Sequence, residues 1–269
     1  MILAALCAPM WVGVRPLGVP AAGVSALGPA AAASGRLGLA RAWLAERRVL
    51  TAACEQYPAR LIGALGPEAP AVFWARGLAG CEFGLAQRWV AVVGTRSPFS
   101  EDAAVVRQFV AEAAALGFGI VSGGATGIDA MARREARRAG VPLLEFLPCG
   151  LEMPFGAGPL RGSGWAQLSA WPDLAEFSTL RAMLRNTYIY ASAEAALVVR
   201  PRYRQGGSWH GAATAIREKR TRVVVSSPAG CWAGRALCGA GAFNYSGGLT
   251  LAEVLAMPAP QPALFSAAG

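Results

Sequence analysis

From Trp89 onward the chain alternates short apolar runs with segments of helical periodicity, and this alternation constrains the fold more than any other feature. The apolar runs predict strands, and the segments between them predict helices. Strands separated by helices of this length favour an α/β fold, a parallel sheet with helices on both faces. The expected strands cover 89–94, 117–124, 141–150, 195–201 and 221–227, and the expected helices cover 100–117, 127–140, 179–192 and 207–219.

The residues outside this series are less regular. Residues 1–36 are rich in Ala, Gly and Pro without a sustained period, which predicts a poorly specified arm. Apolar residues at helical spacing predict a helix within 39–55, and 71–77 resemble a strand. We therefore expect three parts, which are an arm over 1–56, an α/β domain over 57–250 and a short tail over 251–269.

Composition limits the compartment and excludes several classes of site. Of the 269 residues 54% are hydrophobic, yet no apolar run reaches the ~18 residues of a membrane span. Arg15 follows the first apolar run instead of preceding it, so we do not expect a secretory signal. The six cysteines form no C-x-x-C pair and His210 is the only histidine, which leaves no zinc-ligand spacing or His-dependent triad. We expect a cytoplasmic protein without metal, cofactor or membrane contact.

The net charge of +9 and the pI of about 9.9 favour a polyanionic partner. Lys219 is the only lysine, so a genomic bias toward arginine is an alternative explanation of the charge. One helix carries a stripe of arginines that a solvated face would also explain. Further arginines lie among aromatic residues, as single-stranded nucleic acids require. The stripe is Arg133, Arg134, Arg137 and Arg138, and the mixed set is Arg181, Arg185, Arg200, Arg202, Arg204, Tyr188, Tyr190, Tyr203 and Trp209.

Three glycine-bearing loops follow predicted strands and precede predicted helices. Ligands of open parallel sheets bind beyond the carboxyl ends of the strands, where the free amides of a helix attract an anion. Glycine permits close approach of a phosphate, hydroxyls add donors, and Arg96 adds a forked cation. Close packing alone would also explain any one such loop, and an ion pair would explain Arg96. The candidate residues are Gly94, Thr95, Arg96, Ser122, Gly123, Gly124, Gly127, Gly207 and Ser208.

Neither a G-x-G-x-x-G fingerprint nor a Walker sequence is present, which favours a backbone phosphate over a nucleoside triphosphate. The carboxylates that catalysis could use are Asp129, Glu145 and Glu194. Asp129 belongs to the first turn of a predicted helix, where such a residue more often braces a loop than acts as a base. No second group at an informative spacing supports a reaction, so we do not expect an enzyme.

Four segments resemble the DNA-processing protein A family (DprA, also called Smf) in order and spacing. They are "VAVVGTRSPFS", "GFGIVSGGATGIDAMA", "LRNTYIYASAEAALVV" and "GGSWHGAATAIREKRTRVVV", and the resemblance covers roughly residues 57–245. It implies an extended Rossmann-like fold that binds single-stranded DNA in a basic pocket without catalysis. It also implies a homodimer that delivers the strand to the RecA recombinase during natural transformation.

The resemblance also assigns residues. Arg96 corresponds to the pocket arginine, and Ser122, Gly123 and Gly127 correspond to the second loop. Arg185 and Asn186 match the start of an R-N-R element, and Gly207 and Ser208 match a G-S element. The chain departs from the family at Thr187, where the third residue of R-N-R would be arginine, and at Met131 and Ala132, where a histidine is usual.

Two alternatives remain open at this stage. A small-nucleotide-binding or nucleoside-phosphate-hydrolysing Rossmann protein would use the same edge of the sheet. Such hydrolases typically carry a P-G-G-x-G-T loop near a catalytic glutamate, whereas this chain has "RQGGSWHGA" with Glu218 far along the helix. A scaffold that has lost its ligand is the other alternative, and Thr187 in place of arginine favours it.

Overall fold

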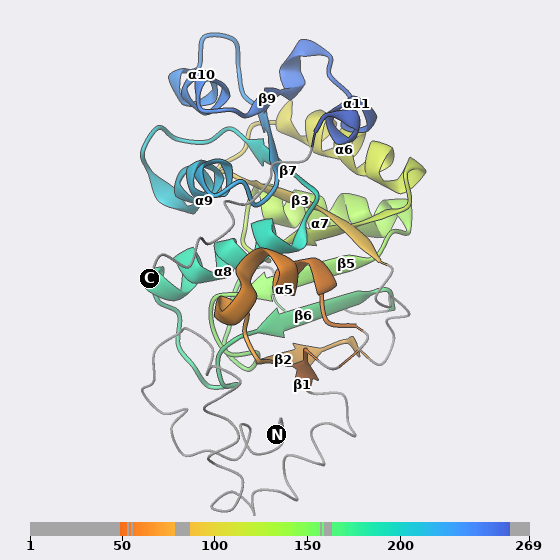
Figure 1. The fold of residues 1–269 in the computed structure, drawn as a ribbon, viewed down its shortest axis with the longest axis vertical. Coiled ribbons are helices and arrows are strands. Elements are labelled where there is room, and N and C mark those ends of the chain that lie inside the picture. The colour runs from red at the N-terminus through yellow and green to blue at the C-terminus, as the bar shows by residue number, and fades with distance from the viewer. Residues whose placement is uncertain are drawn as a thin grey trace, which may run out of the picture.

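The computed structural model describes residues 49–52, 54, 56–78, 87–156, 158 and 163–258, so most of the predicted arm and tail lie outside the described residues. A nine-stranded sheet forms the centre, in the order β1-β2-β6-β5-β4-β3-β7-β8-β9 (Figure 1). The strands are β1 (Val49–Thr51), β2 (Val72–Arg76), β3 (Arg88–Gly94), β4 (Phe118–Ser122), β5 (Leu143–Leu147), β6 (Trp165–Ser169), β7 (Ala195–Val199), β8 (Arg222–Ser226) and β9 (Phe243–Asn244).

The sheet is parallel from β6 to β9, and β2 and β1 extend it in antiparallel pairing. The central strands are mostly apolar because both of their faces are covered, and the polar side chains of Ser122 in β4 and Glu145 in β5 are buried with them. The predicted α/β fold is confirmed. The helices are α5 (Ala59–Leu65), α6 (Asp102–Ala115), α7 (Ile128–Ala139), α8 (Thr179–Ser192), α9 (Gly206–Arg217), α10 (Trp232–Gly239) and α11 (Leu251–Ala256), with two 3-10 turns, η2 (Gly66–Glu68) and η4 (Tyr245–Gly247).

Alternate side chains of each central strand enter two separate cores. In β3, Val90 and Val92 pack with residues of α6, α7 and α11, whereas Ala91 and Val93 pack with residues of α5, α8, α9 and α10. This follows from the two-residue period of a strand, which sends successive side chains to opposite faces. The helices therefore form one layer on each face of the sheet (Figure 1).

The prediction of a helix within 39–55 is wrong for the part that the structure describes, because Val49–Thr51 forms strand β1. Leu50 pairs with Phe73 of β2, and all three residues of β1 are buried. Sheet pairing and burial therefore override the helical spacing of the apolar residues here. Strand β6 lies in a stretch for which the sequence predicts no element, and it joins β5 to β2.

The first residues of the predicted tail belong to the domain. Leu251 and Val254 of α11 are fully buried against the α6 layer. The Leu251 amide donates a hydrogen bond to Glu112 Oε2 of α6 at 2.7 Å. Thr250 and Glu253 form a capping box at the start of this helix, which explains why it begins there. Among the described residues, none of the helices has both the length and the apolar character that crossing a bilayer requires.

Candidate functional site

The carboxyl ends of β3 and β7 border a pocket of about 480 Å³. These two strands are neighbours, and the chain leaves them in opposite directions, because β4 lies beyond β3 and β8 lies beyond β7. Open α/β sheets bind their ligands at such a switch point. The loops after β3 and β7, the first turns of α7 and α9, and one face of α8 form the pocket wall.

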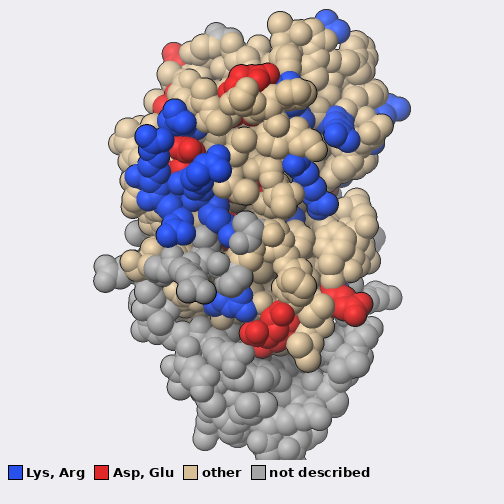
Figure 2. Space-filling model, turned by 180° about the vertical axis from the view of Figure 1, so that it is seen from behind, with Lys and Arg blue, Asp and Glu red and all other residues tan. Residues whose placement is uncertain are grey.

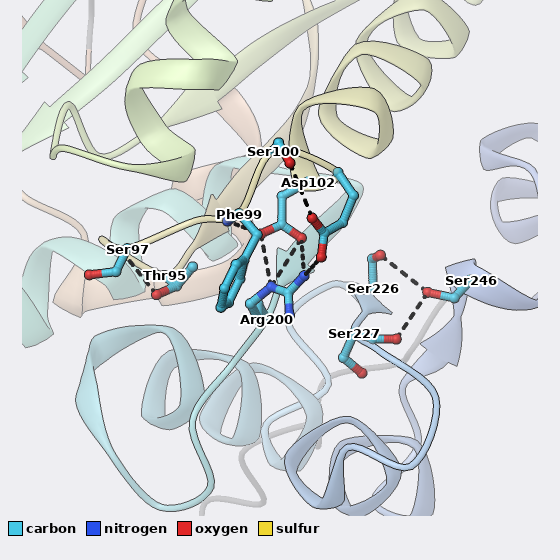
Figure 3. A network of polar contacts seen from close by, with 10 residues as sticks. Thr95, Ser97, Phe99, Ser100, Asp102, Arg200, Ser226, Ser227 and Ser246 are labelled. Atoms are coloured by element: carbon cyan, nitrogen blue, oxygen red, sulfur yellow. Dashed lines mark hydrogen bonds and ion pairs between the residues drawn. The ribbon is translucent and has the colours of Figure 1, made fainter.

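The loop after β3 enters the pocket wall at Gly94. A Cβ at this position would lie 2.5 Å from the Val199 carbonyl oxygen, so only glycine fits there. The Thr95 amide donates to the same carbonyl at 3.1 Å, and the Thr95 hydroxyl accepts a hydrogen bond from the Ser97 amide at 3.1 Å (Figure 3). Arg96 is exposed at the rim, and no carboxylate of the described residues forms an ion pair with its guanidinium. The loop thus presents to the pocket a cation that forms no ion pair with a carboxylate of the described residues.

The loop between β4 and α7 supports the wall from behind. The Ser122 hydroxyl is buried and donates to the Val92 carbonyl at 2.8 Å. Gly127 has φ +79°, and a Cβ there would lie 2.6 Å from Arg96 Cα. Four residues that the sequence places in the site therefore lie behind the lining, namely Ser122, Gly123, Gly124 and Gly127. Ala125 and Asp129 are the residues of this segment that line the pocket.

Arg185 and Asp129 form a buried pair at the floor of the pocket. Arg185 Nη1 lies 3.8 Å from Asp129 Oδ2, and Arg185 is 4% exposed. Burial raises the pKa of Asp129, although Arg185 acts in the opposite direction, and burial lowers the pKa of Arg185. Arg185 Nε has no hydrogen-bond partner among the described residues. Arg185 thus adds a buried, charged guanidinium to the pocket lining, and forked guanidinium donors suit an oxyanion.

The predicted bracing role of Asp129 is confirmed, since its Oδ2 accepts a hydrogen bond from the Ala125 amide at 3.2 Å. The other carboxylates considered from the sequence lie outside the pocket lining. Glu145 is fully buried and pairs with Arg133, and Glu194 pairs with Arg88. Glu218 follows α9 at the end opposite the pocket. Asp129 is therefore the acidic residue of the described lining.

The start of α9 closes the third side of the pocket. Asn186 Nδ2 donates to the Gly207 carbonyl at 3.1 Å, and the Ser208 hydroxyl donates to the Gly94 carbonyl at 2.7 Å. These two bonds tie α9 to α8 and to the end of β3. No side chain caps the amino terminus of α9, whose residues Gly206, Gly207 and Ser208 line the pocket. Its first-turn amides carry the positive end of the helix dipole.

Arg200 follows β7 and also lines the pocket, but two acidic residues at the start of α6 hold it (Figure 3). Its Nε lies 2.8 Å from Asp102 Oδ2, and its Nη2 lies 2.8 Å from Glu101 Oε1. Its guanidinium also covers the Phe99 ring at 4.4 Å. The pairing raises the pKa of Arg200 through the hydrogen bond to Asp102. Arg200 therefore contributes less free charge to the pocket than Arg96 does.

The structure divides the remaining basic and aromatic candidates. Tyr188, Tyr190 and Trp209 are buried, so they do not present open ring faces, whereas Tyr203 is 37% exposed. Arg133 is buried, and the exposed arginines of α6 and α7 are Arg107, Arg134, Arg137 and Arg138. Figure 2, seen from behind, shows basic side chains gathered densely on that face of the molecule. The predicted stripe is thus an exposed face for three of its four arginines.

Sequence reasoning named Arg185, Asn186 and Tyr190 of α8 but missed Thr179 and Met183, which also line the pocket. Thr179, Met183, Asn186 and Tyr190 all line the pocket at spacings of three or four residues. That spacing places them on one face of the helix. Extending the helical period in both directions from Asn186 is the sequence signal that could have found them.

The fold and the pocket define a Rossmann-like α/β protein with an arginine-bearing pocket at the switch point of its sheet. The family model described as DNA recombination-mediator protein A matches residues 48–235. The chain belongs to this family, and the predicted resemblance is confirmed. No curated protein matches the chain.

Two solved structures share the fold. DNA processing protein A (DprA) from Streptococcus pneumoniae is 22% identical with a TM-score of 0.62, and the match covers 73% of this chain and 70% of that one. DNA processing protein A from Helicobacter pylori, whose structure addresses its single-stranded DNA binding mode, is 20% identical with a TM-score of 0.55. That match covers 68% of this chain and 86% of the Helicobacter protein.

Proposed function

We propose that the pocket at the β3–β7 switch point binds the phosphate backbone of single-stranded DNA. The observation that carries the proposal is the convergence of two arginines and a helix amino terminus on one pocket. Arg96 has no carboxylate partner among the described residues, Arg185 lines the same pocket, and no side chain caps the first amides of α9. Phosphate oxygens satisfy all three kinds of donor.

Family membership and the Helicobacter relative support DNA as the source of those phosphates. The net charge of +9 supports a polyanion in the same way. We propose a binding protein and not an enzyme. Asp129, the carboxylate of the described lining, is engaged with Arg185 and the Ala125 amide, and the described lining holds neither His nor Cys.

Fluorescence anisotropy with labelled oligonucleotides over a salt series tests this function. We expect the affinity to fall as salt increases and to be higher for a single strand than for a duplex of the same length. Arg96→Ala should weaken binding uniformly across sequences and flatten the salt slope by about one ion. Arg137→Ala is the matched control, because it removes an arginine that is also exposed but lies outside the pocket lining.

Equal affinities of the wild type and Arg96→Ala would contradict the pocket as the binding site. A volume of about 480 Å³ also suits a mononucleotide, so nucleotide binding is the second candidate. A thermal-shift series with mononucleotides separates the two, since a ligand stabilises only the state that binds it. Stabilisation by a mononucleotide without affinity for an oligonucleotide would favour the second candidate.

We further propose that the protein protects incoming single strands and delivers them as a homodimer to a RecA-type recombinase in the cytoplasm. The description of the family as a recombination mediator supports the delivery step. The described cysteines Cys54, Cys149, Cys231 and Cys238 are free thiols, which suits a reducing compartment. Sedimentation velocity measures the dimer, and assembly of recombinase filaments on protein-coated strands measures delivery.

A further inference from the structure

Three aromatic rings form a continuous cluster beside the pocket, which we call the aromatic ladder (Tyr203, Trp209 and Trp232). The Tyr203 ring meets Trp209 edge-on at 4.9 Å between centroids and meets Trp232 edge-on at 6.0 Å. Trp209 is 8% exposed and anchors the ladder in the core. Tyr203 is 37% exposed and Trp232 is 60% exposed, so the outer two rings are open to solvent.

The aromatic ladder begins at the pocket rim. Tyr203 is a central residue of a four-residue turn, which the Gln205 amide closes on the Arg202 carbonyl at 3.1 Å. Arg202 and Gln205, the two ends of this turn, line the pocket. Adjacent Cα atoms are about 3.8 Å apart, so Tyr203 lies one residue step beyond the lining. The ladder ends at Trp232, which is the first residue of α10.

Arginines accompany the exposed rings. The Arg204 guanidinium lies 5.2 Å from the Tyr203 ring centre, and that of Arg235 lies 5.6 Å from the Trp232 ring. No carboxylate of the described residues pairs with Arg202, Arg204 or Arg235, and all three are exposed. A single exposed ring needs no explanation. Neighbouring rings interleaved with unpaired cations form the combination that binds unpaired bases and their backbone.

We propose that Tyr203 and Trp232 form a base-stacking site for the nucleobases next to the phosphates held in the pocket. This inference rests on the proposed function and adds a second contact to it. The strand runs from the pocket over the Arg202–Gln205 turn toward α10, with its bases against the rings and its phosphates near the three arginines. Every base has a π face, so the site tolerates any sequence.

Binding of two strands of equal length tests the inference, one an oligothymidylate and the other with abasic positions at its centre. Trp232→Leu keeps the apolar bulk and removes the π system, whereas Trp232→Phe keeps an aromatic face. We expect Trp232→Leu to weaken binding of the oligothymidylate about tenfold, the effect of losing one stacked base. Its effect on the abasic strand should stay below about twofold, and Trp232→Phe should retain most of the affinity.

Leu174→Ala, at a residue 77% exposed and outside the ladder, is the control for loss of exposed apolar surface. A second measurement is quenching of tryptophan fluorescence by the oligothymidylate. Trp232 is the exposed tryptophan of the described residues, so Trp232→Phe should lose most of the quenching while it still binds. This measurement does not depend on the folding of Trp232→Leu.

Equal binding of the oligothymidylate by the wild type and both variants would overturn the stacking site and leave the pocket intact. Equal weakening on both strands would also overturn it, because the contact would then not involve bases. A change of sedimentation coefficient with unchanged DNA affinity would assign the ladder to a protein interface instead. Failure of the wild type to bind any strand would remove both the proposed function and this inference.

Discussion

Arg200 and Asp102, which are 98 positions apart in the chain, form an ion pair with three hydrogen bonds beside the pocket (Figure 3). Arg200 Nε donates to Asp102 Oδ2 at 2.8 Å, and Nη2 donates to Oδ1 at 3.0 Å. The backbone of Arg200 has φ +51°, a conformation that residues other than glycine rarely adopt. The pair therefore joins the end of β7 to the start of α6 and holds a strained turn in place.

We predict that Asp102→Asn lowers the free energy of unfolding by about 2–3 kcal/mol, because it leaves a mostly buried guanidinium without its principal partner. Urea denaturation at neutral pH measures the change. Glu101→Gln is the matched control, since Glu101 contacts the same guanidinium but its side chain is 66% exposed. The control should change stability by less than about 1 kcal/mol. Equal losses in the two variants would show that burial of Asp102 does not matter.

We predict that Gly127→Ala both destabilises the fold and weakens DNA binding. The added Cβ would meet the Thr95 carbonyl and the Arg96 backbone, and φ +79° is unfavourable for alanine. We expect a loss of about 1–3 kcal/mol in unfolding free energy, with Arg96 displaced from the rim. Thermal denaturation and anisotropy measure the two effects.

The control for Gly127→Ala is Gly63→Ala in α5, where a Cβ meets nothing within 4 Å. This substitution should stabilise the protein by about 0.5–1 kcal/mol, because alanine favours a helix more than glycine does. It should leave DNA binding unchanged. Normal binding by Gly127→Ala would contradict the role of Gly127 in positioning Arg96.

The ion pair of Glu194 with Arg88 predicts a pH dependence of stability. Hydrogen bonding from Arg88 lowers the pKa of Glu194 below its ordinary value of 4.5. The unfolded chain therefore takes up the proton first, so this stabilisation is present above pH 4.5 and is lost as pH falls through the folded pKa. Glu194→Gln should reduce stability by less than about 1 kcal/mol at pH 6, and the difference from the wild type should shrink toward pH 3.

Urea denaturation at several pH values measures this difference. Arg88→Met is the complementary variant, because it removes the largest cause of the lowered pKa and keeps the carboxyl group. It should flatten the acid side of the stability profile in the same way. A constant difference between the wild type and Glu194→Gln from pH 6 to pH 3 would contradict the prediction.

The sequence predicts strands β3, β4, β5, β7 and β8 well, because each is buried on both faces and appears as a short, mostly apolar run. The helix over 179–192 is predicted with the bounds of α8. The antiparallel edge is predicted less well. Strand β1 has three residues and β6 mixes polar with apolar ones, so neither carries a clear local pattern. Their pairing with β2 is decided by contacts distant in the chain.

The sequence predicts which loops form the pocket, but it does not predict which of their arginines remain without an ion-pair partner. Arg96 and Arg200 both follow central strands, yet Arg200 is paired with Asp102 and Arg96 has no carboxylate partner among the described residues. Likewise Tyr190 is buried and Tyr203 is open, although both lie near arginines in the sequence. Whether an arginine is unpaired or a ring is exposed depends on neighbours that are distant in the chain. The local periodicity of the sequence does not show those neighbours.

The antiparallel edge of the sheet affects how the chain folds while it is being synthesised. Strand β2 ends at Arg76, but its inner partner β6 begins at Trp165. On a ribosome that adds about 5–20 residues per second, β2 waits several seconds for this partner. Until then it can pair with β1 alone, and an isolated two-stranded pair is marginally stable. The amino-terminal edge is therefore completed after the parallel strands β3, β4 and β5 have been made, and a ribosome stalled before Trp165 would present β2 as an open edge.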